Sequence, residues 1–329
     1  MSPSPRLHLA VAAAAALAMT ASLAAQANLP NPYRPVANWA QLPASMKWGG
    51  VISIEPDARG NVWVFHRGET PILRFDRSGK LMSSFGAGMF VQPHGMTVDR
   101  DGDVWVTDAQ NKDNKGQQVF KFTADGKLLM TLGKAGVVGE GPDTFSGPSD
   151  VVVAANGDIF VADGHVAMSN GRIVKFSKDG KFIKAWGKLG SAPGEFNVPH
   201  SIAIDSRGRI FVADRSNNRI QIFDQNGTFI DQWKQFGRPS GVYIDKNDTI
   251  YVADSQSNAT QNPGFTRGIR IGSAKDGRVT AFIPDTTPDP DSNNNAGPEG
   301  IAGDTSGNVY VGDVSKMELM KYVRSAGTQ

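Results

Sequence analysis

The sequence predicts an all-β protein, a six-bladed β-propeller closed by an N-terminal strand, and three observations support this fold class. A short strand-forming phrase occurs six times. The aromatic residues at the centre of the copies are 42, 55, 51, 40 and 59 residues apart, which is the spacing of propeller blades. Turn signals such as Asp-Gly and Asn-Gly separate further short apolar runs around each copy, as expected for hairpins.

Each copy of the phrase begins with a turn residue, continues with β-branched and aromatic residues, and ends on a polar residue. The six copies occupy residues 61–66, 103–108, 158–163, 209–214, 249–254 and 308–313. Five of them end in aspartate. We expect these aspartates to accept hydrogen bonds from backbone N–H groups of the turn that follows.

The fourth repeat shows the expected anatomy of a blade most clearly. Residues 201–205, 209–213, 219–224 and 228–233 form four short runs separated by turn signals, and we assign them to strands a to d. The sixth repeat ends after its strand c, around residues 319–323. We therefore expect residues 33–41 to supply the missing outer strand and close the ring, which removes the open edge.

Residues 1–27 have the pattern of a secretory signal peptide. Arg6 and His8 precede an apolar run over residues 9–23, and Ala25-Gln26-Ala27 is a small-x-small cleavage pattern. A membrane anchor is the alternative interpretation, although the run is shorter than the ~20 apolar residues of a spanning helix. We expect a secreted or periplasmic protein whose residues 28–329 form one propeller domain. Because the chain has no cysteine, its stability must come from core burial and any bound metal.

The charge balance argues against a polyanionic partner. Without Arg6, 33 of the 34 basic residues remain against 32 acidic residues. This balance gives no electrostatic reason to expect nucleic acid or an anionic membrane as a partner. A small-molecule or peptide-derived substrate, bound by a monomer, is the expectation.

A comparison between repeats identifies candidate metal ligands. The position five residues before the end of strand a is occupied, in blades 1 to 6, by Gly50, His94, Ser149, His200, Ser240 and Glu299. The three residues that can ligate a metal, His94, His200 and Glu299, fall in alternate blades. Because strand a is innermost, their side chains should meet at the axis about 120° apart. Two imidazoles and a carboxylate suit Zn²⁺ or another first-row divalent ion. Histidines that merely fill the channel and bond to carbonyls are the simpler alternative.

Residues that follow strand b should surround the same mouth, because strand b is antiparallel to strand a. These residues are Arg67, Asp108, His165 and Arg215. Arg67 could pair with a substrate carboxylate or form a salt bridge with one of the turn aspartates, and both interpretations stay open.

Four phrases carry a family resemblance: Val-Phe-His-Arg-Gly at 64–68, Pro-His-Gly-Met-Thr-Val-Asp at 93–99, Phe-Asn-Val-Pro-His-Ser at 196–201, and Val-Ala-Asp-Arg-Ser-Asn-Asn-Arg-Ile-Gln at 212–221. Through them, the chain resembles the catalytic propeller of peptidyl-α-hydroxyglycine α-amidating lyases, which are NHL-repeat proteins. The resemblance implies a zinc ion held by three histidines, an arginine and a tyrosine that act on the substrate, and a calcium ion deeper in the channel.

By this resemblance His94 and His200 match zinc ligands and Arg67 matches the catalytic arginine. The chain departs from the family twice. Glu299-Gly300 stands where the family has histidine and aspartate, and His165 stands where it has the tyrosine. Glutamate can still ligate zinc, and His165 could act as a general base. Without the aspartate, a calcium ion would have to rely on backbone carbonyls near Ile52 and Met96.

Two functions from different classes follow. The first is a metal-dependent carbon–nitrogen lyase that cleaves a carbinolamide into an amide and glyoxylate. The second is a noncatalytic NHL-repeat propeller that binds a peptide, sugar or protein. A lactonase-type calcium propeller fits less well, because such sites use carboxylates and amides rather than paired histidines. Residues 284–298, rich in Pro, Asp and Asn, could gate the mouth or form a surface connection.

Overall fold

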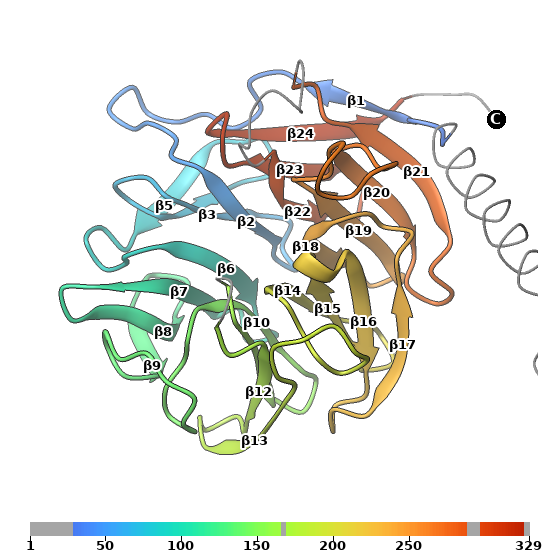
Figure 1. Cartoon of the computed structure of the whole chain (residues 1–329). Helices are drawn as coiled ribbons and strands as arrows, with labels where there is room; N and C mark the ends of the chain where they lie inside the picture. Colours follow the sequence, from blue (N-terminus) through green and yellow to red (C-terminus); the bar gives the residue numbers. More distant parts are fainter. Residues whose placement is uncertain (1–28, 166–168, 288–296, 326–329) are drawn as a thin grey trace, which may run out of the picture.

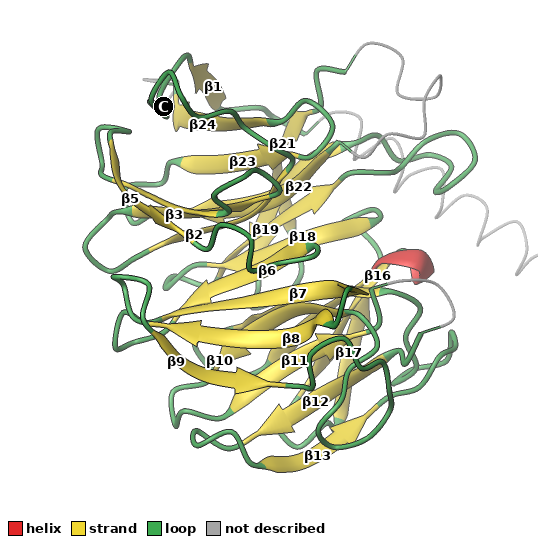
Figure 2. Cartoon of the chain, turned by 90° about the vertical axis from the view of Figure 1, so that its left-hand side faces the viewer, coloured by secondary structure: helices red, strands yellow, loops and turns green. Residues whose placement is uncertain are grey.

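The computed structural model describes residues 29–165, 169–287 and 297–325. Within these residues, 24 strands form six antiparallel four-stranded sheets arranged as blades around one axis (Figures 1 and 2). The predicted six-bladed propeller is confirmed. The only helical element of the described chain is one 3₁₀ turn, η1 (Arg215–Asn217). Among the described residues, no helix has the length and apolar character that a membrane crossing requires. The predicted signal segment lies outside the described residues and stays a prediction.

In blades 1 to 5 the four strands follow one another in sequence from the axis outward, as do the first three strands of blade 6. Blades 1 and 2 contain β2 (Val51–Pro56), β3 (Val62–His66), β4 (Ile72–Phe75), β5 (Leu81–Phe85), β6 (Pro93–Val98), β7 (Val104–Lys112), β8 (Lys115–Phe122) and β9 (Leu128–Leu132). Blades 3 and 4 contain β10 (Pro148–Val153), β11 (Ile159–Asp163), β12 (Arg172–Phe176), β13 (Phe182–Trp186), β14 (Pro199–Ile204), β15 (Ile210–Asp214), β16 (Arg219–Phe223) and β17 (Phe229–Trp233). Blades 5 and 6 contain β18 (Pro239–Ile244), β19 (Thr249–Asp254), β20 (Gly268–Ser273), β21 (Val279–Pro284), β22 (Pro298–Gly303), β23 (Val309–Asp313) and β24 (Glu318–Arg324).

The ring closes as the sequence predicts. Strand β1 (Tyr33–Val36) pairs antiparallel with β24 and becomes the outer strand of blade 6 (Figure 1). Tyr33 is 5% exposed and packs in the cluster shared by blades 5 and 6. Closure therefore joins the N-terminal strand to the last blade through both backbone pairing and apolar burial.

The apolar core lies between neighbouring blades rather than at one centre. Between blades 6 and 1, for example, Ile54 and Phe75 pack with Ala302 and Tyr310. Five further clusters fill the other blade interfaces. Because neighbouring blades cover both faces, second strands such as β3, β11, β15 and β23 are buried along their whole length, and this packing fixes how the inner strands meet at the axis.

Every inner strand has a break in its pairing with strand b, close to its first residue. The register shifts fall at 51/53, 93/96, 148/150, 199/201, 239/241 and 298/300. A bulge adds a residue and turns its side chain in a new direction. The bulged positions include His94, His200 and Glu299, so the break directs these side chains to the axis.

The bulge corrects one repeat alignment made from the sequence. In blade 1 the equivalent residue is Ile52, not Gly50, because the turn after strand a starts at Asp57, whose N–H bonds to Asn61 O at 2.8 Å. In blade 2 the same turn starts at Asp99, five residues after His94, and bonds to Asp103 O. Alternate-blade placement of the ligand types is unaffected, since isoleucine, like glycine, cannot bind a metal through its side chain.

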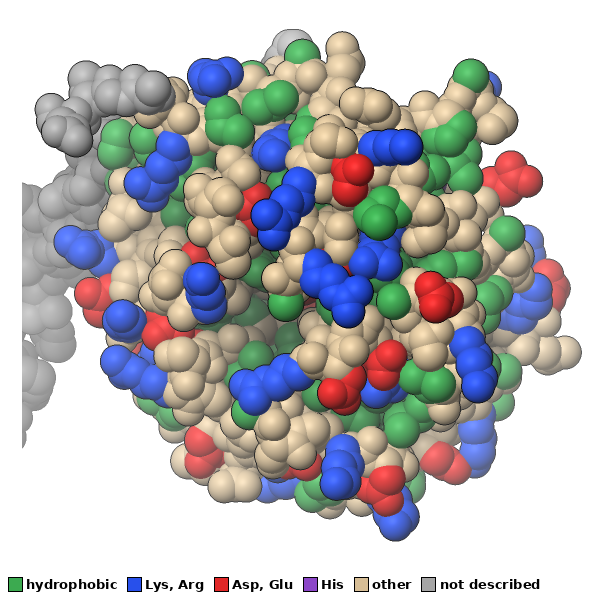
Figure 3. All heavy atoms as spheres, turned by 180° about the vertical axis from the view of Figure 1, so that it is seen from behind, with side chains coloured by type: hydrophobic (Ala, Val, Ile, Leu, Met, Phe, Trp, Pro, Cys, Tyr) green, Lys and Arg blue, Asp and Glu red, His purple; other side chains and the backbone are tan. Residues whose placement is uncertain are grey.

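On the face opposite to that of Figure 1, basic and acidic side chains lie next to one another, and no histidine is visible there (Figure 3). The histidines therefore do not belong to that surface.

Candidate metal centre

Six bulged residues surround the axial channel, one from each blade. They are Ile52, His94, Ser149, His200, Ser240 and Glu299. His94, His200 and Glu299 are 2%, 3% and 6% exposed, so the polar groups that reach the axis are buried. A buried polar ring needs internal partners, because water cannot supply them.

The serines of the intervening blades orient the histidines through their backbone. His94 Nδ1 lies 2.6 Å from Ser149 O, and His200 Nδ1 lies 2.8 Å from Ser240 O. Since a carbonyl only accepts, each Nδ1 carries the proton and each Nε2 keeps its lone pair. Both Nε2 atoms are buried without a hydrogen-bond partner. Two buried lone pairs that converge without a donor fit a metal ion.

His165 joins them from the loop after β11. The N–H groups of Gly164 and His165 both donate to Gly147 O at 2.9 Å, which fixes the loop. Gly164 has a φ of +146°, and a Cβ there would lie 2.8 Å from Gly171 N. The path that delivers His165 therefore requires glycine.

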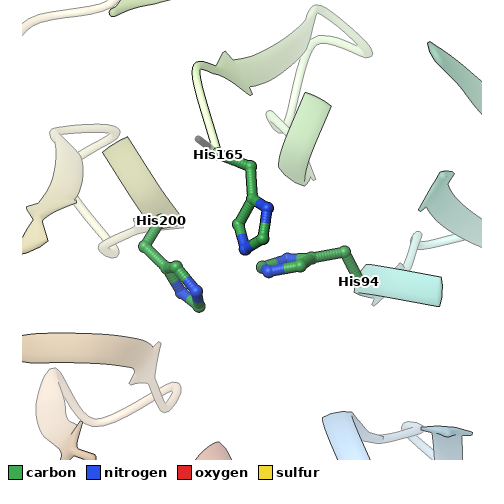
Figure 4. A group of neighbouring side chains, drawn as sticks. All are labelled: His94, His165 and His200. Atoms are coloured by element: carbon green, nitrogen blue, oxygen red, sulfur yellow. The ribbon is translucent and has the colours of Figure 1, made fainter. Parts of the chain in front are cut away.

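The three imidazoles of His94, His165 and His200 point toward one another (Figure 4). Their ring centroids are 4.1, 4.5 and 5.2 Å apart. One ring nitrogen from each lies within 4.8 Å of the others, and this trio is the one such group in the described part of the chain. Three imidazoles can hold a divalent ion and leave a fourth position open, after a small contraction to metal–nitrogen distances near 2 Å.

The ligand set predicted from the sequence and the histidine trio of the structure share His94 and His200 and differ in the third member. Glu299, predicted as a ligand, lies beside the trio with Oε2 3.8 Å from His200 Nε2. Its other oxygen faces Arg215 Nη1 at 3.8 Å and the Ser255 hydroxyl at 3.5 Å. His165, predicted as the base, occupies the third place. The attraction between Glu299 and Arg215 favours the position in which Oε1 faces the guanidinium while Oε2 faces His200.

Two arginines border the same centre. Arg67 Nε donates to Pro93 O, the residue before His94, at 3.3 Å. Arg215, to which the sequence analysis gave no role, follows strand b of blade 4 as Arg67 follows that of blade 1. The position that Arg215 shares with Arg67 in the repeat is the signal in the sequence that could have identified it as a site residue. Two guanidiniums against the Glu299 carboxylate leave a positive centre suited to an anion.

Asp108, the remaining predicted mouth residue, has a structural role, since it accepts from Gln92 N–H at 2.6 Å, and so does the neighbouring residue His66. His66 Nδ1 accepts from Gly49 N–H at 3.0 Å, and its Nε2 lies 3.0 Å from Thr70 O. The aspartates at the ends of strands b mostly bind the loop that leads into strand a. Asp163, for instance, accepts from Ser146 N–H at 2.7 Å. The sequence predicted that these aspartates bind the turn that follows strand b. Asp313 does so, because it accepts from Ser315 N–H.

Burial keeps the trio neutral. Burial lowers the pKa of His94 and His200 well below the usual value, and the positive charge of Arg215 adds to this effect. Burial, Arg215 and Arg67 lower the pKa of His165 to about 3. Uncharged imidazoles at neutral pH are the form that ligates metals. Burial raises the pKa of Glu299, while Arg215 and Arg67 oppose the shift.

Asp150, further along the channel, predicts a pH dependence of stability. Burial raises its pKa to about 7, although Ile202 N–H and the Ser201 hydroxyl donate to its Oδ2. The folded chain thus binds this proton more tightly than the unfolded chain. The contribution to stability is fully present below the unfolded pKa of about 4 and is lost as the pH rises through 7. A shift of about three pKa units corresponds to a loss of about 4 kcal/mol in the free energy of unfolding.

Urea denaturation of Asp150→Asn at pH 4.5 and pH 8 checks this prediction. We expect the difference in unfolding free energy between the two pH values to shrink by most of that amount, because asparagine keeps the acceptor oxygen without titrating. Glu55→Gln, measured in parallel, isolates the second channel carboxyl, whose pKa burial also raises. An unchanged pH difference in Asp150→Asn would contradict the assignment.

Comparisons with known proteins agree with the repeated blades of the fold. The NHL repeat profile matches residues 90–122 and 196–223. Peptidyl-glycine alpha-amidating monooxygenase B of Xenopus laevis is 35% identical over 321 aligned residues, which cover 84% of this chain and 34% of that protein. A probable peptidyl-alpha-hydroxyglycine alpha-amidating lyase of Caenorhabditis elegans is 43% identical over 159 residues, covering 46% of this chain and 42% of that protein. The chain thus spans less than half the length of either relative.

Among solved structures, a streptogramin B lyase aligns with a TM-score of 0.57 and 16% identity, over 89% of this chain and 97% of that chain. At this identity the likeness shows the shared propeller fold alone. The sequence relatives, not the structural one, therefore bear on the chemistry of the site.

Proposed function

We propose that this chain, an NHL-repeat propeller that resembles peptidyl-α-hydroxyglycine α-amidating lyases, is a metal-dependent lyase. The proposed reaction cleaves the carbon–nitrogen bond of a carbinolamide, R–CO–NH–CH(OH)–COO⁻, into the amide R–CO–NH₂ and glyoxylate. The observation that supports it most is the trio of converging imidazoles next to two arginines, in which His94 Nε2, His200 Nε2 and His165 Nδ1 have no hydrogen-bond partner.

The proposed ligands are His94, His165 and His200, and the proposed ion is zinc, which imidazole nitrogen suits. When bound, zinc supplies a Lewis acid that acidifies a substrate hydroxyl. Ser149 O and Ser240 O hold His94 and His200 in the tautomer that this role needs. Such outer bonds raise the basicity of the ligand nitrogen.

Arg67 and Arg215 would bind the substrate carboxylate, because a guanidinium pairs with a carboxylate through two parallel hydrogen bonds. Glu299, the acidic group beside the trio, would accept the hydroxyl proton. The oxygen electron pair released by that proton forms the aldehyde C=O, and the C–N bonding pair passes to nitrogen. Glu299 returns the proton to nitrogen, so that the amide leaves neutral and the carboxylate is restored.

The proposal is tested by measuring bound metal and glyoxylate release on the purified protein. We expect about one zinc ion per chain and glyoxylate from an N-acyl-α-hydroxyglycine. His94→Ala should lose both. The matched control is His66→Gln, which changes a buried histidine outside the trio and should keep both.

The noncatalytic alternative makes a different prediction. A propeller in which the ion only ties blades together would release no glyoxylate, and His94→Ala would lower its melting temperature alone. Metal at full occupancy without glyoxylate release would favour that alternative over the lyase.

A further inference from the structure

Arg238 lies at the entry to the inner strand of blade 5, two residues before Ser240, whose carbonyl orients His200. Its backbone belongs to blade 5, because its N–H donates to Asp254 Oδ2 at 3.0 Å. Its side chain is half-buried and crosses to blade 4. Arg238 has no part in the reaction proposed above, so its role is open.

The Arg238 guanidinium binds the turn that carries Arg215. Nη1 donates to Arg215 O and to Asn218 Oδ1, both at 3.1 Å, and Nη2 donates to the Ser216 hydroxyl at 3.4 Å. Nε donates to Gln256 Oε1, in the loop after β19, at 3.1 Å. Each nitrogen of the guanidinium therefore has a partner, and three of the four acceptors belong to η1 or to the residue that caps its C-terminal end.

The turn η1 is held by two blades. Within blade 4, Arg215 N–H donates to Val198 O at 3.1 Å, and Ser216 N–H donates to Asn197 O at 3.0 Å. From blade 5, Arg238 donates to the carbonyl of Arg215. The backbone of Arg215 is thus held through its N–H by one blade and through its carbonyl by the next.

Contacts of the Arg215 side chain direct it only weakly. Its Nε is buried without a hydrogen-bond partner, and its Nη1 lies 3.8 Å from Glu299 Oε1, which is longer than a hydrogen bond. The position of the guanidinium therefore depends on the backbone from which it extends. Burial lowers the pKa of Arg215 to about 10, Glu299 opposes this shift, and the charge of Arg238 adds to it. Arg215 stays charged at neutral pH, so Arg238 can affect where this charge lies rather than whether it is present.

We propose that Arg238 is a positioning residue, which holds η1 from blade 5 and thereby places the Arg215 guanidinium where a substrate carboxylate can bind. This inference rests on the proposed function for the identity of the bound group. A guanidinium pairs with a carboxylate through two parallel hydrogen bonds, and this geometry tolerates little displacement. A change at Arg238 should therefore weaken carboxylate binding without removing the metal.

The test measures dissociation constants of the purified protein, in the presence of zinc, for N-acetylglycine and for N-acetylglycinamide by calorimetry. Neither compound has the hydroxyl that the reaction needs, so the ratio of the two constants reports binding of the carboxylate alone. Arg238→Met keeps a long side chain without its donors. We expect it to lower the carboxylate preference about tenfold at native metal content, since a displacement of about 1 Å can cost up to about 100-fold. An unchanged preference would overturn the proposal.

Arg209→Met is the matched control, because Arg209 joins the same two blades at the opposite end of their strands. Arg209 is half-buried like Arg238, and its Nη2 donates to Ala274 O of blade 5 at 2.6 Å. Both variants should lower the melting temperature, and Arg209→Met should leave the carboxylate preference unchanged. An equal fall of the preference in Arg209→Met would show that contacts between these blades act on binding in general, and would refute a specific role of Arg238.

A double-variant cycle separates positioning from a general effect of charge. In Arg215→Ala, Arg238→Met should change the preference by less than about twofold, because its effect passes through the missing guanidinium. Arg238→Lys should recover only part of the loss, because an ammonium keeps the charge but lacks the planar array of donors. Full recovery by lysine, or a tenfold loss that persists in Arg215→Ala, would contradict positioning.

Asn218→Gly provides a second test that leaves the arginine in place. Asn218 has a φ of +52°, which glycine adopts freely, and the substitution removes one acceptor of Arg238. We expect the carboxylate preference to fall about threefold, as for the loss of one hydrogen bond. An unchanged preference in this variant would also count against the proposal.

Glyoxylate release from N-acetyl-α-hydroxyglycine separates this inference from the proposed function. Release by the native protein, together with an unaltered carboxylate preference in Arg238→Met, retains the lyase and removes the positioning role. A preference that depends on Arg238, without any release, retains the positioning role and removes the lyase. A native protein that binds both probes equally removes the carboxylate role of Arg215 and this inference with it.

Discussion

Alanine at His165 is expected to remove the metal and to lower kcat/KM for glyoxylate release about a thousandfold, whereas Glu299→Gln should keep the metal. We propose different roles for His165 and Glu299, the two residues at which the chain departs from the lyases that it resembles. His165 belongs to the trio whose ligand atoms lie within 4.8 Å of one another. Glu299 lies beside it and faces Arg215. Loss of one of three ligands leaves two imidazoles, which bind zinc too weakly to retain it.

The thousandfold loss reflects the several kcal/mol of barrier lowering that a Lewis acid contributes. Glu299→Gln should also slow the reaction, by about 10²- to 10⁴-fold in kcat, because glutamine cannot accept the proton. The two variants should differ in their metal content, which is measured by elemental analysis after dialysis. If His165→Ala keeps the metal and Glu299→Gln loses it, Glu299 is the third ligand, as predicted from the sequence. That result would refute His165 as a ligand.

The sequence was sufficient for the fold and for placing two histidines of the trio at the axis, because both depend on the repeat. Blade spacing identified six equivalent inner strands, and the propeller symmetry brings their first residues to the axis. His94 and His200 stand at that position and needed no further information. The same counting slipped by two residues in blade 1, since Glu55 was taken for the turn residue that is Asp57.

The third place could not be predicted by counting because His165 does not occupy a repeated position. It follows strand b, and its direction depends on Gly164 in a conformation that few other residues adopt and on two N–H groups that share Gly147 O. Glu299 occupies the repeated position, and its Oε1 lies 3.8 Å from Arg215 Nη1, a contact between residues far apart in sequence. The third member of the trio therefore depends on loop geometry and on contacts between distant residues, neither of which the periodicity of the repeats contains.

Arg215→Ala is expected to lower kcat/KM for a carboxylate substrate about a hundredfold, mainly through KM. The Arg215 side chain is 12% exposed and its Nη1 lies 3.8 Å from Glu299 Oε1, so its charge is poorly screened by water. A hydrogen bond to a charged group in such surroundings contributes about 1.5 to 3 kcal/mol, which corresponds to about 10- to 150-fold in binding. Arg215→Lys should recover part of the loss, because an ammonium keeps the charge but not the two parallel hydrogen bonds.

The measurement that isolates this role compares the α-hydroxyglycine compound with its uncharged carboxamide. In the native protein the carboxylate should be the better substrate, and in Arg215→Ala the two should become nearly equal, since the variant loses the charge that separates them. Metal content and the melting curve of the variant control for damage to the trio or the fold. Arg77→Ala, at an exposed arginine whose guanidinium donates to Arg59 O, should leave the preference intact.

If Arg215→Ala weakens both substrates equally while the metal stays bound, Arg215 acts by positioning Glu299 and not by binding the carboxylate. The positive charge beside the trio would then serve the proton acceptor, and Arg67 alone would hold the substrate.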